Sequence, residues 1–114
     1  SLEVVEDMRE RKHRLLTGSD AVVALPGGCG TFEEVFEAIT LKRLGIYFNP
    51  IVFVNTRGFY DGLRSFLEHS IRERMMGDAH AAMWSFVDRP DQVLDEITRT
   101  PPWPRDARGF AAVK

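Results

Sequence analysis

The chain has 114 residues, 44% of them hydrophobic, and a net charge of −2 with a pI near 5.9. This length and composition suit one globular domain with a modest core, and the charge excludes the basic field that binds DNA or RNA. One cysteine, Cys29, excludes an internal disulfide, and no Cys and His cluster indicates a metal. The apolar runs are too short to cross a bilayer, so we expect a cytoplasmic protein without a membrane partner.

Apolar periodicity and turn residues predict strands that alternate with helices along the chain. In chain order, the expected strands cover residues 2–5, 21–25, 50–54 and 84–87. The expected helices cover residues 7–16, 31–44, 59–75 and 90–99, with Gly45 as a left-handed cap after the second. Prolines after residue 100 end regular structure, so residues 1–99 are expected to form the domain and residues 100–114 a loosely ordered tail.

This alternation predicts an α/β fold, a Rossmann-like doubly wound parallel sheet with right-handed crossovers. Such sheets bind ligands at the carboxyl ends of strands, where the strand order reverses. The chain offers only about four strands and begins inside one of them. We therefore expect the C-terminal half of a nucleotide-binding domain.

A glycine-rich segment at residues 25–34, Leu-Pro-Gly-Gly-Cys-Gly-Thr-Phe-Glu-Glu, joins a predicted strand to a predicted helix. Glycines allow close approach of the backbone to an anion, and the amides at a helix N-terminus attract it. The segment lacks the Gly-Lys-Ser/Thr of an ATPase loop and the Gly-x-Gly-x-x-Gly spacing. Two interpretations stay open, a phosphate-binding loop and a tight connection without a ligand.

Thr31 and Glu34 have the Thr-x-x-Glu spacing of a capping box, in which each side chain bonds an amide at the helix start. Capping and catalysis are therefore both open for Glu34. Cys29 is expected to be passive because no histidine is placed to activate it.

A mixed-charge cluster precedes the glycine segment at residues 9–12, Arg-Glu-Arg-Lys. Alone, such a cluster is typical of a solvated helix face. Adjacent parallel strands would nevertheless bring one guanidinium towards a phosphate bound at the glycine segment, where its planar fork suits oxyanions.

Two segments together, Met-Arg-Glu-Arg-Lys at residues 8–12 and Pro-Gly-Gly-Cys-Gly-Thr-Phe-Glu-Glu at residues 26–34, resemble the Lonely Guy family. Its signature is Met-x-x-Arg-Lys followed by Pro-Gly-Gly-x-Gly-Thr-x-x-Glu. The resemblance implies a phosphoribohydrolase, from a family formerly labelled possible lysine decarboxylase. Such an enzyme cleaves the N-glycosidic bond of a nucleoside 5'-monophosphate, a cytokinin riboside 5'-monophosphate or AMP, to free base and ribose 5-phosphate.

The resemblance further implies a homodimer that needs no metal or organic cofactor, with Arg11 and Glu34 as catalytic residues. The implied substrate contacts are Met8, Lys12, Gly27, Gly28, Cys29, Gly30, Thr31, Glu33 and Thr40. Ionised Glu34 would stabilise the positive charge that develops on the ribose and orient the attacking water.

An alternative to hydrolysis, from a different class of function, is a non-catalytic nucleotide or molybdopterin carrier that uses the same glycine segment. A lysine decarboxylase is not expected, because a pyridoxal enzyme needs a Schiff-base lysine and a partner for the ring nitrogen, which Lys12, Lys42 and Lys114 do not offer.

Overall fold

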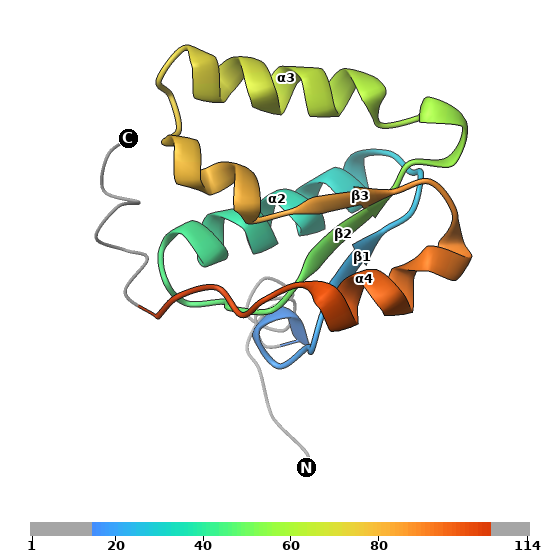
Figure 1. Cartoon of the computed structure of the whole chain (residues 1–114), viewed down its shortest axis with the longest axis horizontal. Helices are drawn as coiled ribbons and strands as arrows, with labels where there is room; N and C mark the ends of the chain where they lie inside the picture. Colours follow the sequence, from blue (N-terminus) through green and yellow to red (C-terminus); the bar gives the residue numbers. More distant parts are fainter. Residues whose placement is uncertain (1–14, 106–114) are drawn as a thin grey trace.

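A three-stranded parallel sheet with helices on both faces forms the body of the protein (Figure 1). The computed structural model describes residues 15–105. Its strands are β1 (Val22–Ala24), β2 (Ile51–Val54) and β3 (Ser85–Val87), and they lie side by side in that order. Its α-helices are α2 (Cys29–Arg43), α3 (Asp61–Arg72) and α4 (Val93–Arg99), and its 3-10 helices are Thr56–Gly58, Asp78–Ala82 and Pro90–Gln92.

The predicted α/β fold with a parallel sheet is confirmed. The strand expected over residues 2–5 and nearly all of the helix expected over residues 7–16 lie outside the described residues. The order β1-β2-β3 runs in one direction, so the reversal of strand order that a doubly wound sheet requires stays a prediction. None of the helices in residues 15–105 combines the length and the apolar composition that a bilayer-spanning segment needs.

Strand β2 lies at the centre of the sheet, and all four of its residues are buried. Because strand side chains alternate between faces, Ile51 and Phe53 belong to the larger core that includes α2, whereas Val52 and Val54 pack against α4. An unbroken apolar run is what a parallel strand covered on both faces requires. The pairing of β1 with β2 therefore places the carboxyl ends of both strands at one edge of the sheet.

The predicted boundaries of the helices shift in two places. Helix α2 begins at Cys29, earlier than expected, because the Gly28 carbonyl already accepts the first helical hydrogen bond, from the Phe32 amide at 3.0 Å. Gly45 has a φ of 77°, which confirms the left-handed cap expected after this helix. Helix α3 is shorter than the predicted 59–75, because a side-chain-stabilised turn occupies its expected start.

Trp103 anchors the segment that follows α4. Its side chain is buried with the main core, and its amide donates to the Phe48 carbonyl at 3.2 Å. Residues 100–105 thus differ from the loose tail expected from their prolines, because a single large aromatic ring offers enough apolar area to fix them. Residues 106–114 lie outside the described range.

Lys42 is buried near the end of α2, with 1% of its surface exposed. Its ammonium donates to the Asn49 carbonyl at 2.8 Å and lies 5.8 Å from the centre of the Trp103 ring. Burial lowers the pKa of Lys42 from 10.5 to about 8. The folded protein therefore holds this amine less strongly protonated than the unfolded chain does.

We expect this burial to make the stability of the fold vary with pH in the alkaline range. Between about pH 8 and 10 the unfolded chain binds more protons at Lys42 than the folded protein, so the free energy of unfolding rises with pH through this window. Relative to Lys42→Met, the wild type should gain more than about 1 kcal/mol between pH 7.5 and 10 in urea unfolding. A constant difference between the two proteins would show that Lys42 is not desolvated.

Candidate functional site

The glycine segment leaves the carboxyl end of β1 at residues 25–28 and runs directly into α2. Gly28 is the N-cap of α2, and no side chain caps the amides of the first turn. Gly28, Cys29 and Gly30 are all exposed. The first amides of α2 are therefore open to solvent, and the helix dipole gives this end a partial positive charge that favours an anion.

The three glycines of this segment differ in what an added side chain would contact. A side chain at Gly27 would collide with the side chain of Thr31. A methyl group on Gly28 or Gly30 would meet nothing within 4 Å, and neither residue has a positive φ. The bare backbone at Gly28 and Gly30 therefore leaves space for a group from outside the described residues.

A cavity of about 260 Å³ lies between the start of α2 and β1. The residues that line it are Val22, Val23, Ala24, Leu25, Thr31, Glu34 and Val35. Thr31 and Glu34 are the polar members of this set, and they lie one helical turn apart on the same side of α2. The structure therefore brings together two of the predicted site residues beside the open helix N-terminus.

The predicted capping box does not form. Thr31 lies inside α2, in its first turn, because the N-cap is Gly28, and no side chain bonds the amides there. Within residues 15–105 the exposed carboxylate of Glu34 has no hydrogen-bond or ion-pair partner. Capping was the structural alternative for Glu34, so its removal leaves the carboxylate available to a ligand.

Glu34 also borders a second cavity, of about 240 Å³. The remaining residues of that lining are Leu15, Leu16, Ser19, Ala21, Val22 and Glu37. Glu34 and Val22 are common to both cavities. A ligand that extends from the glycine segment along β1 would thus pass the Glu34 carboxylate.

Other predicted site residues are not brought to this cavity. Thr40 follows Thr31 by about two and a half helical turns, which places it on the opposite side of α2. Its hydroxyl donates to the Phe36 carbonyl at 2.8 Å. Glu33 is exposed and lines neither cavity.

Cys29 is an exposed free thiol at the start of α2. Met8, Arg11 and Lys12 precede the described residues, so their predicted roles are untested.

Tyr60, which no sequence motif marks as part of the site, contacts the glycine segment: its hydroxyl donates to the Leu25 carbonyl at 2.6 Å. Burial raises the pKa of Tyr60, which keeps its hydroxyl protonated as a donor at neutral pH. The only sequence signal is an aromatic residue near the start of the helix predicted at residues 59–75, and this signal does not reveal a contact with a residue 35 positions earlier.

A family model described as "Possible lysine decarboxylase" matches residues 1–97 of the sequence. The chain belongs to this family. Curated relatives that align with most of this sequence are described as cytokinin riboside 5'-monophosphate phosphoribohydrolases. These relatives confirm the resemblance to the Lonely Guy family.

A "Probable cytokinin riboside 5'-monophosphate phosphoribohydrolase" of Oryza sativa subsp. japonica is 35% identical over 96 residues, which cover 84% of this chain and 42% of the relative. A second such rice protein is 41% identical over 87 residues, covering 76% of this chain and 37% of the relative. A cytokinin riboside 5'-monophosphate phosphoribohydrolase of Arabidopsis thaliana is 43% identical over 72 residues, 63% of this chain and 34% of the relative. The chain thus spans less than half the length of these relatives.

The two kinds of glycine in the segment predict two different mutational effects. Gly28→Ala should unfold at the wild-type urea concentration, because its methyl group meets no neighbour, yet bind inorganic phosphate at least about tenfold more weakly in calorimetric titration. Wild-type phosphate affinity in Gly28→Ala would contradict anion binding at this helix end.

Gly27→Ala should lose about 1–3 kcal/mol of stability in urea unfolding, because the Thr31 side chain must move.

Proposed function

We propose that this protein hydrolyses the N-glycosidic bond of a nucleoside 5'-monophosphate, a cytokinin riboside 5'-monophosphate or AMP, to free base and ribose 5-phosphate. The observation that carries the proposal is the shared cavity of Thr31 and Glu34 beside the uncapped N-terminus of α2. The names of the relatives, phosphoribohydrolases in both plants, support the same reaction.

The 5'-phosphate would bind at the start of α2. Its dianion would accept hydrogen bonds from the exposed amides of the first turn, where Gly28 and Gly30 leave the backbone bare. The Thr31 hydroxyl, which lines the adjoining cavity, is placed to add a further donor. Gly27 contributes indirectly, because only glycine leaves room for the Thr31 side chain in this position.

Glu34 would act on the ribose. Cleavage of the bond between C1' and the base nitrogen builds positive charge on the sugar, and a carboxylate one turn from the phosphate-binding amides stabilises it. The same carboxylate orients a water molecule, whose oxygen bonds to C1' as the bond from C1' to the base nitrogen breaks. One water proton passes by way of the carboxylate to the departing base, and the other stays on the new hydroxyl group of the ribose. Arg11 would hold the substrate against Glu34, and the second cavity bordered by Glu34 would receive the base.

Lysine decarboxylation is not supported at this site. Lys42 is the lysine in residues 15–105, and it lies near the C-terminal end of α2, at the far end of the helix from the glycine segment. It lines neither cavity, and its ammonium is bonded to the Asn49 carbonyl. A Schiff base with pyridoxal phosphate would need an accessible amine in the cavity itself.

Residues 1–99 are proposed to form the C-terminal part of a single Rossmann-like domain. Among residues 15–105, β1 pairs with β2 alone and lies at the edge of the sheet, so its other edge is open to a further strand of the whole protein. The exposed free thiol of Cys29 supports a reducing cytoplasm as the location.

The assignment of Glu34 is tested by base release from AMP and isopentenyladenosine monophosphate, using the whole protein. Glu34→Gln keeps the size of the side chain and removes its charge, so kcat should fall by about 10²–10³. Glu68→Gln, an exposed carboxylate on α3, is the matched control and should keep the wild-type rate. Equal rates in all three proteins would refute the role of Glu34. Stoichiometric binding without turnover in the wild type would instead indicate a carrier.

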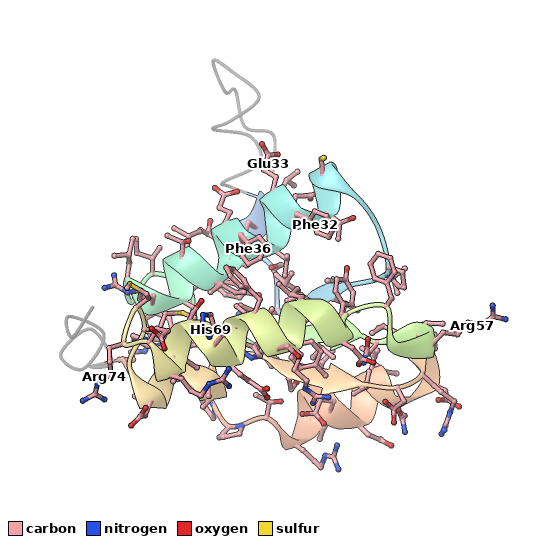
Figure 2. All side chains as sticks on the ribbon, turned by 90° about the horizontal axis from the view of Figure 1, so that it is seen from above. Phe32, Glu33, Phe36, Arg57, His69 and Arg74 are labelled. Carbon is pink, nitrogen blue, oxygen red and sulfur yellow. The ribbon has the colours of Figure 1, made fainter. Side chains whose placement is uncertain are left out.

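We further infer that two copies of the chain pair through α2. Phe32 and Phe36 are 36% and 38% exposed, and both lie on the side of α2 that faces α3 (Figure 2). Phe66 on α3 and Ile46 after α2 are more exposed still. Large aromatic residues one helical turn apart on a solvent-facing surface are typical of a subunit interface. Such an interface would also bring the Thr40 side of one α2 near its partner.

This surface predicts a dimer that a single charge disrupts. Phe36→Asp should sediment as a monomer at micromolar concentration, where the wild type sediments as a dimer, because a buried carboxylate without a partner costs several kcal/mol, about 3–5. Leu94→Asp, on the exposed face of α4, should leave the dimer intact. A wild-type monomer would refute the pairing, and a dimeric Phe36→Asp would place the interface elsewhere.

A further inference from the structure

The buried side chain of Tyr60 connects the turn after β2 to the glycine segment after β1. It is 1% exposed, and its ring packs edge-on against Phe53 with centroids 5.0 Å apart. Its hydroxyl donates to the Leu25 carbonyl at 2.6 Å. Leu25 directly precedes Pro26 and the glycines, so this bond holds the chain at the point where the segment leaves the sheet.

The backbone of Tyr60 is itself held by Asn55. The buried Asn55 side chain accepts a hydrogen bond from the Tyr60 amide at 2.5 Å and donates to Asp61 at 2.8 Å. Gly58 completes the turn with a φ of 73°, and a side chain there would collide with the Asp61 carboxylate. Because Asn55 immediately follows β2, the position of Tyr60 is set by the central strand of the sheet.

We propose that Tyr60 is a positioning residue that fixes the glycine segment for binding of the 5'-phosphate. The proposal rests on the proposed function, in which the amides at the start of α2 hold that phosphate. The Leu25 carbonyl and the Gly27 amide are separated by Pro26 alone, and proline has a fixed φ. An anchor on Leu25 is therefore transmitted through few rotatable bonds to the amides of Gly27 and Gly28.

The chain contains a natural control for this role. Its sequence has 2 tyrosines, and the other, Tyr47, is also 1% exposed. The Tyr47 hydroxyl bonds the Ser19 side chain at 3.1 Å and donates to the Ser19 carbonyl at 3.3 Å, before β1 begins. Each tyrosine thus tethers one end of β1, and only Tyr60 tethers the end that leads to the glycines.

Removal of the Tyr60 hydroxyl should loosen the glycine segment while the ring stays packed. The segment would then sample conformations whose amides do not converge on one anion, which weakens substrate binding more than it slows the bond cleavage at Glu34. For Tyr60→Phe, the KM for a nucleoside 5'-monophosphate should rise about tenfold while kcat stays within about threefold. Tyr47→Phe should leave both values unchanged.

Hydrogen exchange of the ligand-free whole protein tests the same role without activity. The Phe32 amide, which donates to the Gly28 carbonyl, should exchange about tenfold faster in Tyr60→Phe than in the wild type, and should exchange at the wild-type rate in Tyr47→Phe. Amides of β2 in the same samples report global opening. An increase at Phe32 without one in β2 supports the positioning role, and an equal increase in β2 overturns it, since Tyr60 would then stabilise only the fold.

Unchanged exchange of the Phe32 amide in Tyr60→Phe also overturns the proposal. If the wild type releases no base from any nucleoside 5'-monophosphate, the proposed function fails, and the exchange comparison still decides whether Tyr60 holds the segment. If base is released and the KM of Tyr60→Phe equals that of the wild type, the function stands and the positioning role is refuted.

Discussion

The parallel pairing of β1 with the fully buried β2 is the constraint on which the rest of the molecule depends. It brings two turns to one edge of the sheet, the glycine segment after β1 and the Asn55 turn after β2. Without this register the Tyr60 hydroxyl would not reach the Leu25 carbonyl. The burial of β2 on both faces therefore stabilises the core and also fixes where the site can form.

The site gains its properties from what the chain leaves out as much as from what it supplies. No side chain caps the first turn of α2, and Gly28 and Gly30 add no bulk there. A helix N-terminus without a cap is less stable than a capped one, by about 1 kcal/mol. In the proposed function the bound phosphate takes the place of the cap and offsets this loss. The Glu34 carboxylate lies about one helical turn further along α2, in the adjoining cavity.

Local pattern predicted much of this structure. The apolar run of β2, the amphipathic stretch of α3 and Gly45 each specify their conformation through neighbouring residues. The glycine segment and Glu34 were found in the same way. The start of α2 was not predicted correctly, because the spacing of Thr31 and Glu34 suggested Thr31 as the N-cap, whereas Gly28 is the N-cap. Contacts distant in sequence, such as the bond from Tyr60 to Leu25, have no local pattern that predicts them. The burial of Trp103 likewise depends on the core it contacts and not on its proline-rich surroundings.

Binding of a phosphate monoester at the start of α2 is the property from which the proposed reaction follows. It is tested by a titration of the 15N-labelled whole protein with ribose 5-phosphate, followed by the backbone amide resonances. The amides of residues 28–31 should shift most, and ribose without the phosphate should leave them unchanged. Shifts that avoid these amides, or that ribose reproduces, would contradict it.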